Sequence, residues 1–159
     1  MKIRLKGWMK WSLSVLVCLG AGAVGSIATA PNISVWYASL HKPFFNPPNW
    51  IFGPVWSTLY VLMGTSFYLV WRKGSQENRH LLTDFALQLV LNILWSFIFF
   101  GWKHPAWAFA EILLLWSVIL WVMVGFYNVS KLATWLLAPY LAWVSFASLL
   151  NYYIWRLNP

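Results

Sequence analysis

The sequence predicts an all-α integral membrane protein, a single bundle of five transmembrane helices with an aromatic, proline-rich loop between the first two. Three observations lead to this prediction. Of the 159 residues, 61% are hydrophobic and only 9% are charged, whereas a soluble domain carries about 25% charged residues. The apolar residues form five segments, each close to the ~20 residues that cross a bilayer core. Aromatic residues make up 20% of the chain, with 14 Trp, which is more than two interfacial belts require.

The expected spans within this single domain (1–159) are residues 8–30, 51–71, 81–101, 105–127 and 133–156. The first span follows a basic stretch, so the start of the chain resembles a secretory signal peptide with Ala28-Thr29-Ala30 as a candidate cleavage site. Within this span, Ala21 with Gly25 and Gly22 with Ser26 form small-x3-small pairs. Such pairs permit either close packing inside the bundle or a homodimer interface.

The stretch from Trp36 to Gly64 reads WYASLHKPFFNPPNWIFGPVWSTLYVLMG. Its first half is expected to be a loop, because Pro43, Pro47 and Pro48 fix φ and remove backbone donors. Aromatic side chains give this stiffened loop a large apolar surface. The sequence therefore predicts a rigid lid that covers a binding site and runs into the second helix.

Polar and aromatic side chains at helical spacing are the candidate site residues of the second and third spans. Asn92 lies near the middle of its span, where an unpaired amide is costly. It forms either a helix–helix hydrogen bond or a polar anchor for an apolar ligand. Ser96 shares its face of the helix and Trp95 borders it. On the second helix, Trp56 and Tyr60 share a face by the same spacing.

The fifth span carries a similar stripe. Trp143 and Ala147 share one face, with Leu150 and Asn151 one turn further on. Aromatic stripes of this kind more often face the core or lipid than a ligand, so the residues alone leave both readings open. Glu111, roughly 9 Å into the fourth helix at 1.5 Å per residue, is expected to be a structural partner in the bundle or an interfacial residue.

Near the C-terminus, Leu150, Tyr152 or Tyr153, and Arg156 fit a proposed cholesterol-contact pattern. That pattern is a weak one. An aromatic belt that ends in a snorkelling arginine explains the same residues.

Several classes of function are excluded. His41 and His104 belong to one end of the predicted bundle and His80 to the other, so no metal site is expected. No acid, base and nucleophile converge in this topology, which argues against a catalytic triad. The single cysteine, Cys18, excludes an intramolecular disulfide. The net charge of +8 comes from basic residues spread over loops, without a nucleic-acid-binding module, so no nucleic-acid partner is expected.

Charge instead predicts the orientation in the membrane. With five spans, three of the eleven Lys and Arg residues lie at one end of the bundle, and eight lie at the other. The positive-inside rule then places the N-terminus in the cytoplasm, and the basic N-terminal flank suggests a bacterial cell membrane. The eight are Lys2, Arg4, Lys6, Lys10, Arg72, Lys73, Arg79 and Lys131.

Four blocks of sequence, HKPFFNPPNW, GPVWSTLY, QLVLNILWSFIFFG and PYLAWVSFASLLNYYIWRLN, resemble the family of tryptophan-rich sensory proteins and mitochondrial translocator (peripheral benzodiazepine receptor) proteins. The resemblance covers nearly the whole chain after the first helix. It implies five transmembrane helices, retention of the first, and a pocket for tetrapyrroles, sterols and drug-like aromatic compounds. In the mitochondrial relatives the C-terminal pattern is associated with sterol binding. The resemblance places in the pocket Tyr37, Pro47, Trp56, Asn92, Ser96, Trp143 and Ala147.

The leading functional hypothesis is a membrane receptor or carrier that binds tetrapyrroles such as protoporphyrin IX, or other hydrophobic aromatic or sterol-like ligands, in stress, oxygen or light signalling. The tetrapyrrole is then a ligand, and no cofactor is obligatory. A first alternative is light- or oxygen-dependent degradation of the bound porphyrin, with Trp56 and Trp143 as redox-active residues. A second is a membrane interaction protein whose pocket only accommodates lipid.

Overall fold

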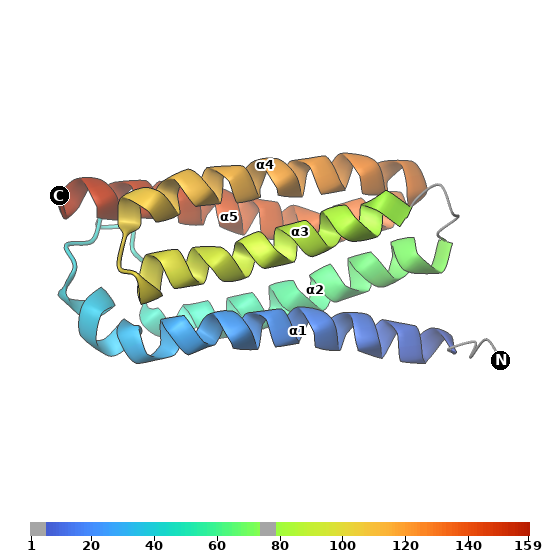
Figure 1. Ribbon diagram of the computed structural model, residues 1–159, viewed down its shortest axis with the longest axis horizontal. Coiled ribbons are helices and arrows are strands. Elements are labelled where there is room, and N and C mark those ends of the chain that lie inside the picture. Colours follow the sequence, from blue (N-terminus) through green and yellow to red (C-terminus); the bar gives the residue numbers. More distant parts are fainter. Residues whose placement is uncertain (1–5, 74–78) are drawn as a thin grey trace.

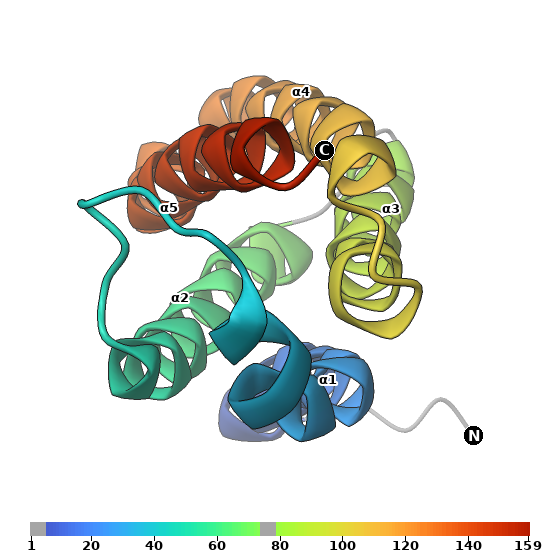
Figure 2. The same ribbon diagram turned by 90° about the vertical axis from the view of Figure 1, so that its left-hand side faces the viewer.

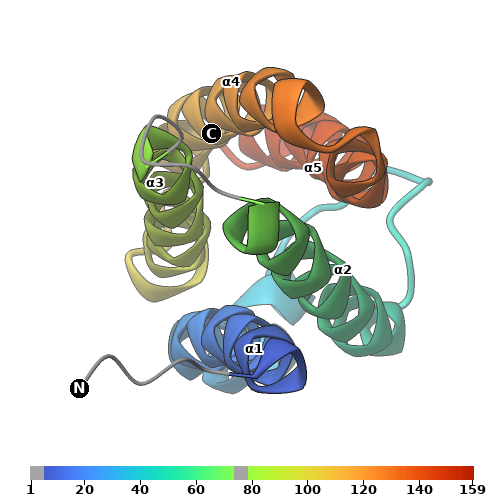
Figure 3. The same cartoon turned by 90° about the vertical axis from the view of Figure 1, so that its right-hand side faces the viewer.

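The computed structural model describes residues 6–73 and 79–159, and within them it contains helices and no strands. Five long helices run back and forth along one axis (Figure 1). Seen along that axis, they follow one another around the bundle in the order α1, α2, α5, α4, α3 (Figures 2 and 3). The prediction of an all-α protein is confirmed. The helices are α1 (Gly7–Asn32), α2 (Phe52–Lys73), α3 (Arg79–Ser96), α4 (Pro105–Val129) and α5 (Lys131–Leu157).

Four of these helices are long and apolar enough to cross a membrane, namely α1 and α3 with their C-terminal extensions, α4 and α5. The remaining helix, α2, has 22 residues, which is about 33 Å at 1.5 Å per residue. That length matches the hydrocarbon core of a bilayer, but Trp, Tyr, Ser, Thr and Gly residues lower the mean hydropathy of α2, and it is not among these four. It packs against α1 and α5 within the bundle.

The first helix is longer than the sequence predicts. We expected it to end at residue 30 and a loop to contain Trp36 and Tyr37. Instead the helix passes through Pro31 and continues as a π-helical turn, η1 (Ile33–Tyr37). Pro31 lacks an N–H and removes one helical hydrogen bond, and the wider π turn follows it. The predicted loop start is therefore wrong, and both aromatic residues belong to the helix.

A second π-helical turn, η4 (Phe97–Gly101), extends α3 at the same end of the bundle. Trp36 of η1 packs edge-on against Phe99 and Phe100 of η4, with ring centroids 5.4 and 6.2 Å apart. Tyr37 contacts the same two rings at 6.3 and 5.7 Å. Aromatic pairs of this kind stabilise beyond the area they bury, so they fix the end of α1 against α3.

The other helices begin and end close to the predicted positions. The second begins at Phe52, after a short 3₁₀ turn, η2 (Asn49–Ile51). The fourth begins at Pro105, as predicted. The fifth begins at Lys131 rather than residue 133, and it runs on through Pro139 as one continuous helix.

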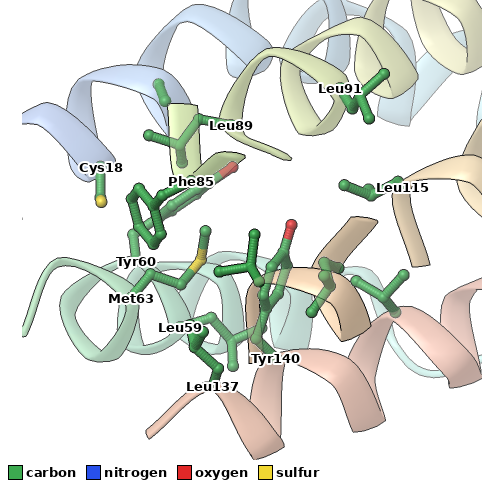
Figure 4. Packing of buried hydrophobic residues seen from close by; sticks show 14 of the residues in the cluster. Cys18, Leu59, Tyr60, Met63, Phe85, Leu89, Leu91, Leu115, Leu137 and Tyr140 are labelled. Atoms are coloured by element: carbon green, nitrogen blue, oxygen red, sulfur yellow. The ribbon is translucent and has the colours of Figure 1, made fainter. Parts of the chain in front are cut away.

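Buried side chains of all five helices form the main core (Figure 4), among them Cys18, Met63, Phe85, Leu115 and Tyr140. Where α1 crosses α2, a Cβ added to Gly64 would lie 2.5 Å from the Cα atom of Val15. Only glycine permits this approach of two backbones, which is the arrangement expected of small residues between membrane helices.

The segment between η1 and α2, here called the roof loop (residues 38–51), crosses the end of the bundle at which the C-terminus lies (Figure 2). Phe45 holds it to α5, with ring centroids 6.3 Å from Phe146 and 5.4 Å from Tyr153. By contrast, Trp50 in the second half of the loop is exposed.

Candidate ligand-binding pocket

A cavity of about 390 Å³ lies between α1, α2, α3 and α5, toward the end of the bundle that the roof loop crosses. The sequence predicts nine ligand-binding residues, and all but Pro47 line this cavity. Pro47 lies in the roof loop, where its carbonyl accepts a hydrogen bond from Asn46 Nδ2 at 3.1 Å. The helices thus bring together residues that are up to 110 positions apart in the chain. The lining residues among the predicted set are Tyr37, Trp56, Tyr60, Asn92, Trp95, Ser96, Trp143 and Ala147.

Eight of the described lining residues are aromatic, and each of the three indoles among them is supported by a neighbouring ring. Trp56 stacks on Tyr60 with centroids 5.5 Å apart. Trp143 meets Phe52 of α2 edge-on at 6.1 Å, and Trp95 stacks on a phenyl ring of η4 at 5.1 Å. These contacts restrict the indole orientations, so the cavity presents preformed flat surfaces.

A chain of hydrogen bonds connects three helices at the inner side of the cavity. The Tyr60 hydroxyl donates to Asn92 Oδ1 at 2.6 Å, and Asn92 Nδ2 donates to the Tyr140 hydroxyl at 3.2 Å. Asn92 is 3% exposed, so an unpaired amide there would be costly. The structure therefore supplies the helix–helix hydrogen bond that the sequence left as one alternative, and Asn92 lines the cavity as well.

A second polar link connects α3, α5 and the start of α4. Trp95 Nε1 donates to Asn151 Oδ1 at 3.1 Å, and Asn151 Nδ2 donates to the Pro105 carbonyl at 2.8 Å. That carbonyl belongs to the first turn of α4. Asn151 itself lines the cavity, although its spacing in the sequence indicates only that it lies one turn beyond the fifth-helix stripe. Through this link α4, which contributes no described lining residue, fixes an indole of the wall.

The first helix contributes small residues to the pocket, which were not among the predicted ligand-binding residues. Gly22 and Gly25 line the cavity. A Cβ added to Gly22 would collide with the Tyr60 ring, and one added to Gly25 would lie 3.1 Å from Ser96 Oγ. The small-x3-small spacing was the available signal, and in this bundle it serves close packing against the cavity wall.

Tyr37, the last residue of η1, closes one side of the cavity and is hydrogen-bonded to the roof loop. This residue is 3% exposed, and its hydroxyl donates to Asn46 Oδ1 at 2.6 Å. Its ring meets Phe52 edge-on at 6.3 Å. Tyr37 thereby connects the end of η1, the middle of the roof loop and the start of α2.

The residues of the sterol pattern are divided by the fold. Leu150 lines the cavity, whereas Tyr152 and Tyr153 are exposed on the outer face of α5. Arg156 is also exposed and lies over the Trp155 ring, 5.9 Å from its centroid. The structure therefore does not bring the four residues to one site.

Two buried polar side chains lie apart from these links. Both carboxyl oxygens of Glu111 and both amide atoms of Gln88 are buried without a hydrogen-bond partner in the described part of the chain. Glu111 was expected to be a structural partner in the bundle or an interfacial residue. It is 8% exposed, so its side chain lies inside the bundle, and no described residue gives its carboxyl the hydrogen-bond partner that the structural alternative expected.

The cavity has no formal charge of its own. Among the described residues that line it, none is Lys, Arg, His, Asp or Glu. Nor do the described residues contain a group of three His, Cys, Asp or Glu side chains able to hold a metal ion. The chemistry on offer is aromatic stacking, apolar contact and a few uncharged hydrogen-bonding groups, which suits a flat, largely apolar molecule.

Comparison with known proteins identifies the family. The family model described as "TspO/MBR family" matches residues 14–156. The chain is 45% identical to "Tryptophan-rich protein TspO" of Chlorobaculum tepidum, over 93% of this chain and 95% of the relative. It is 44% identical to the human "Translocator protein", over 77% and 75% of the two chains, and 34% identical to "Tryptophan-rich sensory protein" of Cereibacter sphaeroides, over 94% of each. This chain is a tryptophan-rich transmembrane protein that belongs to the TspO/MBR family.

Proposed function

We propose that this protein is a membrane receptor that binds a tetrapyrrole such as protoporphyrin IX in the cavity between α1, α2, α3 and α5. The observation that carries the proposal is the set of three indoles, Trp56, Trp95 and Trp143, around one uncharged cavity. A planar macrocycle exposes large apolar faces, and indole rings stack on such faces with offset geometry. The relatives named as translocator and sensory proteins support a receptor-like role.

The uncharged lining also predicts how such a ligand is oriented. Carboxylates buried in an apolar site without a partner are strongly disfavoured. The propionate groups of a porphyrin therefore remain at the mouth of the cavity, while the macrocycle enters between the indoles. Asn92 and Ser96 are two of the uncharged polar residues in the lining that would contact its edge.

A second candidate function is favoured by the position of Trp56 and Trp143, which both line the cavity. Their indoles are then close enough to a bound, photoexcited porphyrin to be oxidised, with molecular oxygen as the final oxidant. This reading makes the protein a light- or oxygen-dependent porphyrin-degrading enzyme. A sterol or lipid in the same cavity is the remaining candidate, with Leu150 as its contact from the C-terminal pattern.

A porphyrin titration of the purified protein, first in darkness and then in light, tests these functions. We expect saturable quenching of tryptophan fluorescence in darkness, with the porphyrin spectrum unchanged. Trp56→Phe and Trp143→Phe keep an aromatic face and should each weaken binding by roughly 1 kcal/mol. Loss of the porphyrin absorption spectrum in light would establish the enzyme, provided that either substitution slows this loss far more than it weakens binding. Absence of saturable binding would contradict the tetrapyrrole proposal and would leave a sterol or lipid as the candidate ligand.

For the membrane arrangement, we propose that α2 is a fifth span and that the N-terminus is cytoplasmic. Among the described residues, one end of the bundle, at which α1, α3 and α5 begin and α2 ends, carries Lys6, Lys10, Arg72, Lys73, Arg79 and Lys131. Lys2 and Arg4 of the same predicted set lie outside the described residues. A bacterial cell membrane remains the proposed location and a homodimer the proposed assembly. Reporter fusions at both termini should report opposite sides, and the same side for both would contradict five spans.

A further inference from the structure

Asn158, just beyond the last turn of α5, pairs with the backbone of His41 in the roof loop. The His41 N–H donates to Asn158 Oδ1 at 2.9 Å, and Asn158 Nδ2 donates to the His41 carbonyl at 2.9 Å. The amide thereby satisfies both backbone groups of one residue, as a residue on a neighbouring antiparallel strand would. These bonds connect positions 117 residues apart.

The Asn158 side chain is held in place by its own helix. Its Nδ2 also donates to the Ile154 carbonyl at 2.8 Å, and its backbone N–H donates to the same carbonyl at 3.1 Å. An amide that is already oriented loses little side-chain entropy when it binds the loop. The end of α5 therefore presents a preformed clasp for His41.

The rest of the roof loop contacts the bundle in one part and is exposed in another. Phe45 packs on two rings of α5, and Asn46 accepts a hydrogen bond from Tyr37. From Pro48 to Trp50 the loop is exposed. Both ends of the loop border the cavity, through Tyr37 before it and Asn49 within it. The clasp at His41 thus holds the first part of a loop that covers the pocket.

We infer that Asn158 is a positioning residue that holds the roof loop closed and thereby sets the rate at which ligands enter and leave the pocket. The inference rests on the proposed function of the cavity. Asn158 does not line the cavity, so it does not contribute to affinity by direct contact. Opening of the roof breaks both bonds to His41 in the free and in the ligand-bound protein alike. Association and dissociation rates therefore change together, while Kd stays nearly constant.

Stopped-flow quenching of tryptophan fluorescence by protoporphyrin IX measures both rates. Each intramolecular hydrogen bond is worth a few-fold to about ten-fold in an equilibrium. Asn158→Ala should therefore raise both rate constants roughly ten- to thirty-fold and leave Kd within about three-fold. His41→Ala is the matched control, because it keeps both backbone groups and should keep both rates. Unchanged rates in Asn158→Ala would overturn the inference, and so would a rise in dissociation alone, which indicates damage to the pocket.

A reversible lock tests the same inference in the opposite direction and does not depend on the folding of Asn158→Ala. The double variant His41→Cys/Asn158→Cys is bridged by a short bifunctional methanethiosulfonate reagent, which leaves the fully buried Cys18 unmodified. Bridging should slow association and dissociation together, and a reducing agent should restore both. Rates that do not fall on bridging would overturn the inference.

Amide hydrogen exchange separates failure of the clasp from failure of the proposed function, because it requires no ligand. The His41 amide should be protected in the wild type and lose protection in Asn158→Ala. If the wild type binds no porphyrin, the proposed function fails, and this measurement still shows whether Asn158 holds His41. A His41 amide that is unprotected in the wild type would show that it does not and would overturn the inference.

Discussion

Substitution of Gly22 by alanine tests the close contact between α1 and the pocket with a single methyl group. A Cβ at this position collides with the Tyr60 ring, lying 2.7 Å from Cδ2 and 3.0 Å from Cζ. Tyr60 in turn donates to Asn92 and stacks on Trp56. The methyl group therefore displaces the ring that connects α2 to the hydrogen-bonded link across the bundle.

The magnitude follows from three contributions. Alanine gains about 1 kcal/mol over glycine within a helix. Overpacking of a fixed ring costs roughly 1–3 kcal/mol, and loss of the Tyr60–Asn92 hydrogen bond costs about 1 kcal/mol more. We therefore expect Gly22→Ala to lower the free energy of unfolding by about 1–3 kcal/mol and to weaken porphyrin binding.

Gly20 on the same helix provides the control, since a Cβ there meets nothing within 4 Å. Gly20→Ala should raise stability by up to about 1 kcal/mol and leave binding unchanged. Thermal unfolding in detergent, followed by tryptophan fluorescence, and the dark porphyrin titration measure the two effects. In a Tyr60→Ala background, Gly22→Ala should become stabilising as well. Equal stability and affinity for the two single alanine variants would refute the proposed contact.

Three further substitutions test other parts of the structure. Glu111→Leu removes a buried carboxyl without a partner among the described residues. Thermal unfolding should therefore show a free energy of unfolding that is about 1–3 kcal/mol higher, and a lower free energy of unfolding would reveal a partner. Asn151→Ala leaves the Trp95 indole N–H unpaired, which should cost about 1–3 kcal/mol and weaken binding in the porphyrin titration; unchanged affinity would show that this link does not fix the wall. Gly64→Ala places a methyl group against the Val15 backbone and should destabilise by more than 1 kcal/mol, which a wild-type unfolding temperature would contradict.

Helical spacing grouped the candidate residues into pairs on one helix face, and the family resemblance assigned those faces to the pocket. Asn92 with Ser96, Trp56 with Tyr60, and Trp143 with Ala147 each lie four residues apart, and each pair lines the cavity. A spacing of four residues places two side chains on one face of a helix whatever the surroundings. Which helices face one another is not contained in that spacing, and the family resemblance supplied it.

The contribution of α1 was missed for a physical reason. Gly22 and Gly25 have no side chain that marks a face, so their pattern indicates close packing without showing what packs against them. The continuation of α1 to Tyr37 depends on a π turn after Pro31, although proline usually ends or kinks a helix. The aromatic contacts with η4 that accompany this turn are long-range and have no local signature.

The contacts of the roof loop could not be predicted from the sequence either. The link between His41 and Asn158 joins two backbone groups to one side chain across 117 positions. Asparagine near a helix C-terminus is common and ordinarily indicates only a cap. Pro47 was assigned to the pocket from the resemblance, whereas the cavity is lined at this place by Tyr37 of η1 and Asn49 of the roof loop. Long-range contacts of this kind follow from how the ends of the helices are placed, not from local spacing.

The state of the polar groups in the wall bears on how selective the pocket is. Tyr60, Asn92, Trp95 and Asn151 are hydrogen-bonded to groups of the bundle itself. A site rejects analogues strongly when a missing ligand group leaves buried protein donors or acceptors unpaired. Here these groups are satisfied before a ligand arrives, so a ligand without matching polar groups incurs no such cost. Discrimination then depends on shape and on the indole faces, and we expect the pocket to accept several flat apolar molecules with similar affinities.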